Sequence, residues 1–122
     1  MKEILLVGTG GCIGASLRYI TSNWFPQFSR VSFPLGTFFI NISGCILIGI
    51  FIGLKLDNTI RLPLEEFIAI GLIGGFTTFS TFGLESFELL KAGQYKIAIL
   101  YTFGNIVIGL IAIGFGIIIS HK

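Results

Sequence analysis

Four long stretches of this sequence are almost free of charged residues, and each is long enough to cross a lipid bilayer as a helix. They cover residues 4–24, where Arg18 is the only charge, 31–54, 67–84 and 97–120. About 20 apolar residues span a hydrocarbon layer of roughly 30 Å in a helix. The apolar runs are continuous, whereas a membrane barrel needs strict alternation of apolar and polar residues. We therefore expect an all-α membrane protein with one domain, 1–122, and helices at approximately 4–24, 33–54, 65–90 with a break near 74–78, and 97–120.

The composition supports a membrane protein. Of the 122 residues, 53% are hydrophobic and only 11% are charged, and the mean hydropathy is +0.94, which a soluble domain does not show. The single histidine, His121, stands at the tail, and the sequence contains no combination of nucleophile, base and metal ligands. We therefore expect a multi-pass protein of the inner (plasma) membrane that is not an enzyme and has no nucleic-acid partner.

Glycine is abundant, with 17 residues, and two pairs have the GxxxG spacing: Gly10 with Gly14, and Gly49 with Gly53. Membrane helices associate through close approach of their backbones, because lipid offers no hydrophobic drive for helix–helix contact. Both pairs therefore predict tight helix packing.

The basic residues are balanced between the two sides of the membrane that four spans imply. One side carries Lys2, Lys55, Arg61 and Lys122, and the other carries Arg18, Arg30, Lys91 and Lys96. Membrane orientation follows the asymmetry of Lys and Arg near the ends of the spans. Without such asymmetry, we expect the chain to insert in both orientations and to form an inverted (antiparallel) dual-topology homodimer. The alternative is a weak bias that a few loop residues decide.

Polar groups inside the spans are the candidate functional residues, because each one is costly unless it faces a partner or water. Thr37 and Asn41 share a helix face at i, i+4, and Tyr101, Asn105 and Gly109 share another. Two helices therefore present a polar stripe. Alternatively, Asn41 and Asn105 only join neighbouring helices by hydrogen bonds.

The third span contains GGFTTFSTFGLE, residues 74–85, in which four hydroxyl residues stand among three phenylalanines. A Gly pair followed by Ser and Thr is typical of a membrane helix that breaks, since hydroxyls or a bound ion satisfy the freed backbone groups. Carbonyls of the first half-helix would then be cation ligands, and the second half-helix would begin near Thr78. The alternative is an unbroken helix whose Ser and Thr bond to their own i−4 carbonyls.

Phenylalanine suits the path of an anion, because the ring edge carries partial positive charge. Helical periodicity places Phe79 and Phe82 together, opposite the hydroxyls. With the Asn41 amide as a donor, their edges would solvate a small anion weakly, as conduction requires.

Three motifs, GGCIGASLRY, GTFFINISG and GGFTTFSTFGLE in this order, give the chain a resemblance to the Fluc (CrcB) fluoride channel family along its whole length. The resemblance implies a fluoride-selective channel that passively exports cytoplasmic fluoride and protects the cell from fluoride toxicity. It also implies an inverted homodimer in the lipid bilayer with two fluoride pores. The expected pore residues are Asn41, Phe79, Ser80, Thr81, Phe82, Tyr101 and Asn105.

The resemblance implies further sites as well. A structural sodium ion would lie on the dimer axis, held by the backbone carbonyls of Gly74 and Thr77 of each subunit. Arg18 matches the arginine of the aqueous vestibule, and Glu85 matches the acidic residue that closes the third motif. In the fourth helix the chain has Asn105 and then Gly109 where the family often has serine or threonine.

Two other functions are compatible with part of this pattern. A small multidrug-type cation/proton antiporter is also a short four-helix protein of dual topology, but it needs a carboxylate within a span, and the first helix has only Glu3 at its edge. A non-transporting assembly subunit would use the glycine motifs and would leave the arrangement of phenylalanines and hydroxyls unexplained.

Overall fold

The structure, a computed structural model, describes residues 1–25, 33–56 and 65–121. Every regular element within these ranges is a helix. The elements are α1 (Lys2–Trp24), α2 (Leu35–Leu56), the π-helix η1 (Glu66–Ile73), α3 (Gly74–Phe76), α4 (Phe79–Lys91) and α5 (Tyr95–Ser120). Four stretches are long and apolar enough to cross a membrane: Lys2–Trp24, Leu35–Leu56, Glu66–Lys91 and Tyr95–Ser120. This confirms the prediction of an all-α protein with four candidate membrane helices.

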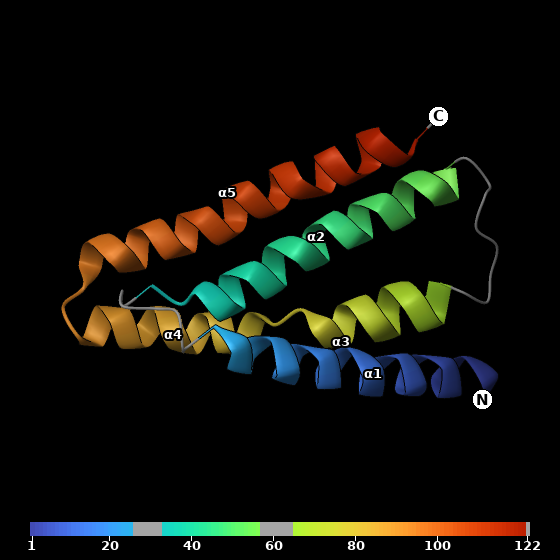
Figure 1. The fold of residues 1–122 in the computed structure, drawn as a ribbon, viewed down its shortest axis with the longest axis horizontal. Coiled ribbons are helices and arrows are strands. Elements are labelled where there is room, and N and C mark those ends of the chain that lie inside the picture. Colours follow the sequence, from blue (N-terminus) through green and yellow to red (C-terminus); the bar gives the residue numbers. More distant parts are fainter. Residues whose placement is uncertain (26–32, 57–64, 122) are drawn as a thin grey trace.

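The helices are arranged as two long pairs (Figure 1). α2 packs along α5, and α1 packs along η1 and α3. α4 continues the third membrane helix beyond an interruption and packs against α5. Both termini lie at one end of the molecule, together with the end of α2 and the start of η1, as four consecutive up-and-down spans require.

Glycines bring the paired helices into backbone contact. Gly10 and Gly14 are buried against the third membrane helix, and a Cβ atom on Gly14 would lie only 2.9 Å from the backbone nitrogen of Phe76. Gly49 and Gly53 are buried against α5 in the same way. The tight packing that the two GxxxG pairs predict is therefore confirmed, and both pairs act within one chain.

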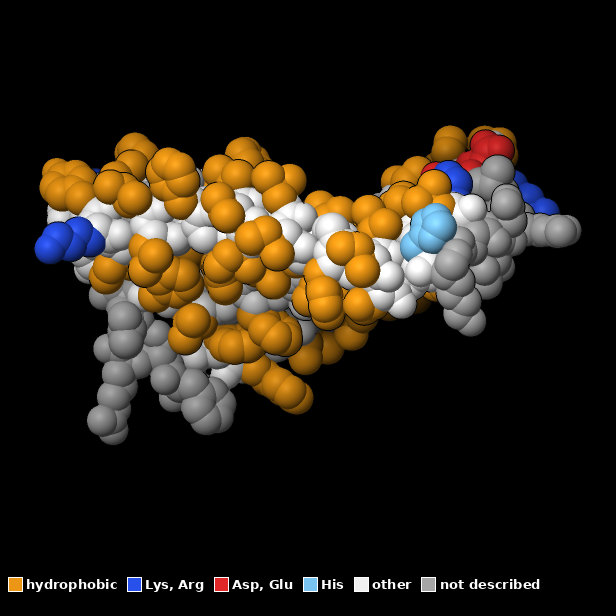
Figure 2. Space-filling view, turned by 90° about the horizontal axis from the view of Figure 1, so that it is seen from above, with side chains coloured by type: hydrophobic (Ala, Val, Ile, Leu, Met, Phe, Trp, Pro, Cys, Tyr) orange, Lys and Arg blue, Asp and Glu red, His pale blue; other side chains and the backbone are white. Residues whose placement is uncertain are grey.

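Large apolar side chains cover the outside of the molecule. Leu5, Ile70, Phe103, Leu110 and Ile118 are all more than half exposed. On the face drawn in Figure 2, apolar side chains cover the middle, and the Lys, Arg, Asp and Glu side chains gather at the two ends. A water-soluble surface does not carry so many exposed apolar side chains, whereas a lipid-facing surface does. The distribution is that of a multi-pass membrane protein.

Four of the five described basic residues lie near the ends of helices, and the fifth, Arg18, lies inside α1. Lys2 begins α1 and Lys55 lies in the last turn of α2, at the end of the molecule that holds both termini. Lys91 ends α4 and Lys96 lies in the first turn of α5, at the opposite end. The other basic loop and tail residues of the predicted balance, Arg30, Arg61 and Lys122, lie outside the described residues.

A tight turn at Gly93 sets the path of α5 relative to α4. Gly93 has a φ of 72°, in the left-handed region that favours glycine. Its N–H donates to the Leu90 carbonyl at 3.0 Å, and the Gln94 N–H donates to the Leu89 carbonyl at 2.9 Å. This pair of bonds is the Schellman motif that ends many helices. It returns the chain so that the first turns of α5 face α4.

Candidate functional site

The third membrane helix is interrupted at Thr77 and Thr78. Both residues have extended backbones, with φ −76° and ψ 159° at Thr77 and φ −148° and ψ 124° at Thr78. The N–H of Thr77 still donates to the Ile73 carbonyl at 3.0 Å. Thr78 then caps the next helix, because its Oγ1 accepts the N–H of Thr81 at 3.2 Å. The second half-helix therefore begins directly after Thr78, as the sequence predicts.

The glycine pair at Gly74 and Gly75 has a different role from the predicted one. Both residues are helical, so the break predicted near 74–78 is limited to Thr77 and Thr78. A Cβ atom on Gly75 would lie 2.8 Å from the carbonyl oxygen of Gly11, so this position serves the close approach of α1. The preceding turns form the π-helix, in which the Gly74 N–H reaches back to the Ala69 carbonyl. The break follows the pair, at the carboxyl end of the expected segment.

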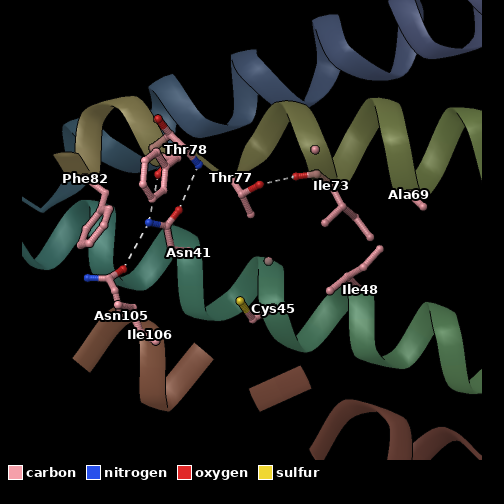
Figure 3. Close-up of a pocket in the computed structure, with 13 residues that line it drawn as sticks. Asn41, Cys45, Ile48, Ala69, Ile73, Thr77, Thr78, Phe82, Asn105 and Ile106 are labelled. Atoms are coloured by element: carbon pink, nitrogen blue, oxygen red, sulfur yellow. Dashed lines mark hydrogen bonds between the residues drawn. The ribbon is translucent and has the colours of Figure 1, made fainter. Parts of the chain in front are cut away.

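A side-chain amide occupies the interruption (Figure 3). The Oδ1 of Asn41 accepts the backbone N–H of Thr78 at 3.0 Å, and its Nδ2 donates to the backbone carbonyl of the same residue at 3.1 Å. Nδ2 also donates to the Oδ1 of Asn105 at 3.2 Å. The Nδ2 of Asn105 in turn donates to the Tyr101 carbonyl at 3.0 Å. The two asparagines thus join α2, the interruption and α5, which is the bridging role that the sequence left open as an alternative.

A cavity of about 390 Å³ lies beside the interruption. Four of the predicted pore residues line it, namely Asn41, Phe79, Phe82 and Asn105, and so do the two predicted cation ligands, Gly74 and Thr77. The rest of the lining is mainly apolar and consists of Gly44, Cys45, Ile48, Ala69, Ile73, Thr78 and Ile106. The cavity therefore combines side-chain amides with aromatic rings.

The two phenylalanines of the cavity differ in burial. Phe79 is 83% exposed, whereas Phe82 is 8% exposed. Their ring centroids are 5.6 Å apart with an interplanar angle of 57°. Phe82 also packs against Tyr101, at 5.4 Å between centroids. One ring is thus fixed in the core of the chain, and the other is presented on its surface.

Three predicted pore residues do not line this cavity. Tyr101 is fully buried and its hydroxyl donates to the Oε2 of Glu85 at 2.6 Å. Ser80 and Thr81 are exposed, and their hydroxyl oxygens lie 3.3 Å and 3.1 Å from the Oγ1 of Thr78. In this structure their hydroxyls belong to the cap that begins α4.

Glu85 lies at a second, smaller cavity of about 160 Å³. Its Oε1 accepts the hydroxyl of Thr37 at 2.9 Å, and its Oε2 accepts that of Tyr101. Thr37 is buried and lines the same cavity, but the predicted site does not include it. The available signal was its i, i+4 spacing from Asn41, which puts both side chains on one face of α2.

Arg18 reaches the interruption from α1. Its Nη1 donates to the carbonyl oxygen of Thr77 at 3.1 Å, in a half-buried position. It lines neither of the two cavities above. The guanidinium therefore places a positive charge next to the broken backbone, at one of the two carbonyls that the sequence assigned to a cation.

The chain also matches known proteins over nearly its whole length. The family described as CrcB-like protein, Camphor Resistance (CrcB), matches residues 5–117. A relative from Azobacteroides pseudotrichonymphae, named fluoride-specific ion channel FluC, is 42% identical over 122 residues, which cover 99% of this chain and 98% of the relative. A relative with the same name from Phocaeicola vulgatus is 45% identical over 125 residues, which cover 99% of this chain and 100% of the relative. Another from Chloroflexus aurantiacus is 45% identical over 118 residues, which cover 96% of this chain and 94% of the relative. The resemblance that the three sequence motifs carry is confirmed, and the chain belongs to the CrcB family.

Proposed function

We propose that this chain is a fluoride-selective channel of the inner membrane that lets fluoride leave the cell passively. The observation that carries the proposal is the cavity at the interrupted helix, where the rings of Phe79 and Phe82 meet the amides of Asn41 and Asn105. The names of the relatives, which cover nearly the whole chain, support the choice of fluoride.

The lining of the cavity suits an anion that must also leave it. Ring edges offer partial positive charge, and the Asn41 amide becomes a donor once an anion displaces one of its present acceptors. Among the described residues that line the cavity, none is Lys or Arg. Conduction needs sites that bind weakly enough to release the ion. Hydrogen fluoride enters from acidic surroundings and dissociates at cytoplasmic pH. A negative interior then drives the anion outwards with about 2.3 kcal/mol per charge for each 100 mV.

We propose an inverted homodimer as the working assembly. The ring of Phe79 is 83% exposed in the single chain although it borders the cavity, so a second copy would complete the wall of the pore. The balance of basic residues in the sequence supports opposite orientations of the two copies. Two copies related in this way would bring two equivalent cavities together.

A sodium ion on the dimer axis fits the backbone at the interruption. In a continuous helix the Thr78 N–H would bond to the Gly74 carbonyl, but here it donates to Asn41. The Thr77 carbonyl accepts one bond, from Arg18, and an oxygen of this kind has two lone pairs. Such hard oxygen ligands suit a small monovalent cation, which would balance the carbonyl dipoles. Exhaustive replacement of sodium by N-methyl-D-glucamine should abolish fluoride flux, and persistent flux would count against the ion.

The antiporter alternative depends on a carboxylate within a span. α4 runs to Lys91, so Glu85 lies inside the third membrane helix, within the expected helix 65–90 although outside the charge-free stretch 67–84. Both carboxylate oxygens of Glu85 accept hydroxyls, from Thr37 and Tyr101. A direct transport assay separates the two functions, because an antiporter requires a proton gradient and a channel does not.

Purified protein in liposomes loaded with potassium fluoride, with a low concentration of sodium on both sides, provides this assay. Once valinomycin lets potassium leave, a fluoride electrode should record rapid efflux, while liposomes loaded with potassium chloride should release little chloride. A cation/proton antiporter would release no fluoride here and would instead move a lipophilic cation in response to a pH gradient. Fluoride release no faster than from protein-free liposomes would therefore rule out a channel, and a cation-transport assay would then separate the antiporter from the assembly subunit.

A further inference from the structure

Asn41 has no spare hydrogen-bonding proton in this structure. One Nδ2 proton goes to the Thr78 carbonyl at 3.1 Å and the other to the Oδ1 of Asn105 at 3.2 Å. Turning the amide over would place its oxygen against two other oxygens and its nitrogen against the Thr78 N–H, so the orientation is unambiguous. An anion in the cavity must therefore displace one of these two acceptors before Asn41 can bind it.

The two acceptors differ in how easily an anion can displace them from Asn41. The bond to the Thr78 carbonyl satisfies a backbone group at a helix break inside the membrane, where an unpaired backbone group is costly. The bond to Asn105 joins two side chains and is the longest of the contacts that Asn41 makes. Both asparagines line the cavity, so this bond faces the space that an ion would enter. The proton shared with Asn105 is therefore the exchangeable one.

We propose that Asn105 is a specificity-determining residue, whose side-chain oxygen holds the exchangeable proton of Asn41 and releases it only to an anion that accepts hydrogen bonds more strongly than an amide oxygen. The inference rests on the proposed channel function. A small hard anion such as fluoride meets the condition, because charge-assisted hydrogen bonds are about twice as strong as neutral ones. Chloride, a larger and more diffuse acceptor, competes less well for the same proton.

The anchoring of Asn105 fits this role. Its Nδ2 donates to the Tyr101 carbonyl one turn back on α5, and its oxygen is directed at Asn41 (Figure 3). When an anion takes the proton, the oxygen is left beside a cavity of about 390 Å³ that has room for water. The Oδ1 of Asn105 can therefore give up its hydrogen bond to Asn41 at low cost, and the bond forms again when the anion leaves.

Two substitutions at this position should shift fluoride binding in opposite directions. Asn105→Ala removes the competing oxygen, so the fluoride concentration that gives half-maximal flux should fall about three- to tenfold, and chloride should begin to permeate. Asn105→Asp supplies a charged acceptor that also repels anions, so fluoride flux should fall by more than about tenfold. A purely structural residue would lose flux in both variants without the fall in half-saturating concentration.

The matched control is Thr102→Ala, which removes a polar group of the same helix that does not line the cavity and bonds to Ser86. It should keep the wild-type half-saturating concentration. The inference is overturned if Asn105→Ala leaves that concentration and the exclusion of chloride unchanged. A wild-type protein that does not conduct fluoride would refute the channel itself, which is a distinguishable result.

A spectroscopic experiment detects binding in the wild-type protein, and a variant serves only to assign one resonance. The Asn41 side-chain amide resonance, identified by its loss in Asn41→Ser, should move when sodium fluoride is added to protein in lipid and should stay in place with sodium chloride. Equal movement with both salts, or movement with neither, would overturn the proposal.

Discussion

At the scale of single residues, Asn41 supplies the partner that the interruption takes from the Thr78 N–H. Both the N–H and the carbonyl of Thr78 bond to it. A buried backbone group without a partner costs about 1–3 kcal/mol. The interruption is thus stabilised by a residue from another helix, and the side chain that stabilises it also borders the cavity.

The proposed role of the phenylalanine rings can be tested at this scale too. Phe79→Ile and Phe82→Ile should each lower fluoride flux by about tenfold or more, equivalent to about 1.4 kcal/mol, because an aliphatic side chain has no positive ring edge. Phe87→Ile is the matched control, since Phe87 lies on the same helix, is exposed and does not line the cavity. Flux is measured with a fluoride electrode after equal amounts of protein are reconstituted. Equal flux in all three variants would remove the rings from the pore.

Most of the predicted residues of the site stand in short motifs, and Asn105 is predicted from its i, i+4 spacing from Tyr101. Phe79, Phe82 and Asn41 stand in motifs that the sequence displays directly. The contact between Arg18 and Thr77 joins positions 59 residues apart, and that between Thr37 and Glu85 joins positions 48 apart. Such pairings depend on how the helices pack, which helical periodicity within one span does not specify.

At the scale of elements, the third membrane helix is a composite of η1, α3, the interruption and α4. The sequence predicts that this helix breaks, because hydroxyl residues able to cap a helix follow small residues there. It does not predict the π-helix η1, which packs along α1. The same packing accounts for Gly75, which sequence reasoning assigned to the break. Hence the sequence predicts that the helix breaks, but it does not predict which residues form the break and which pack against α1.

Substitution of glycine by alanine at two positions of α1 tests how this helix packs against the third membrane helix. Gly14→Ala places a Cβ atom within contact of the Leu72 carbonyl and 2.9 Å from the Phe76 nitrogen, whereas a Cβ atom on Gly8 meets nothing within 4 Å. Gly14→Ala should therefore lower the free energy of unfolding by about 1–3 kcal/mol. Gly8→Ala should leave it unchanged or raise it by up to about 1 kcal/mol. Thermal unfolding in detergent compares them, and equal stability of the two variants would contradict the packing described here.

At the scale of the whole molecule, we propose that one chain is not the complete transport unit. Apolar side chains cover the exterior, and Phe79 is presented on it while bordering the cavity. The order of the helices puts both termini at one end of the molecule. The side of the membrane on which a terminal tag lies therefore gives the orientation of that chain.

Dual topology makes a prediction about such tags. In intact cells, a protease-sensitive tag after the carboxyl terminus should be cleaved from outside in roughly half of the molecules, because balanced basic residues give no preferred orientation. Extra lysines next to the tag should shift the population so that the tag stays inside, as the positive-inside rule requires. Protection of every wild-type tag, or cleavage of every one, would contradict the inverted dimer.

The central claim is that fluoride crosses this protein passively and alone, and the reversal potential of the current tests it most directly. In a planar bilayer with a tenfold fluoride gradient, a perfectly selective passive pore reverses at about 59 mV, the Nernst potential for one charge. We predict that value, unchanged when an opposing pH gradient or a chloride gradient is imposed. A reversal potential that follows the proton or the chloride gradient would contradict the account.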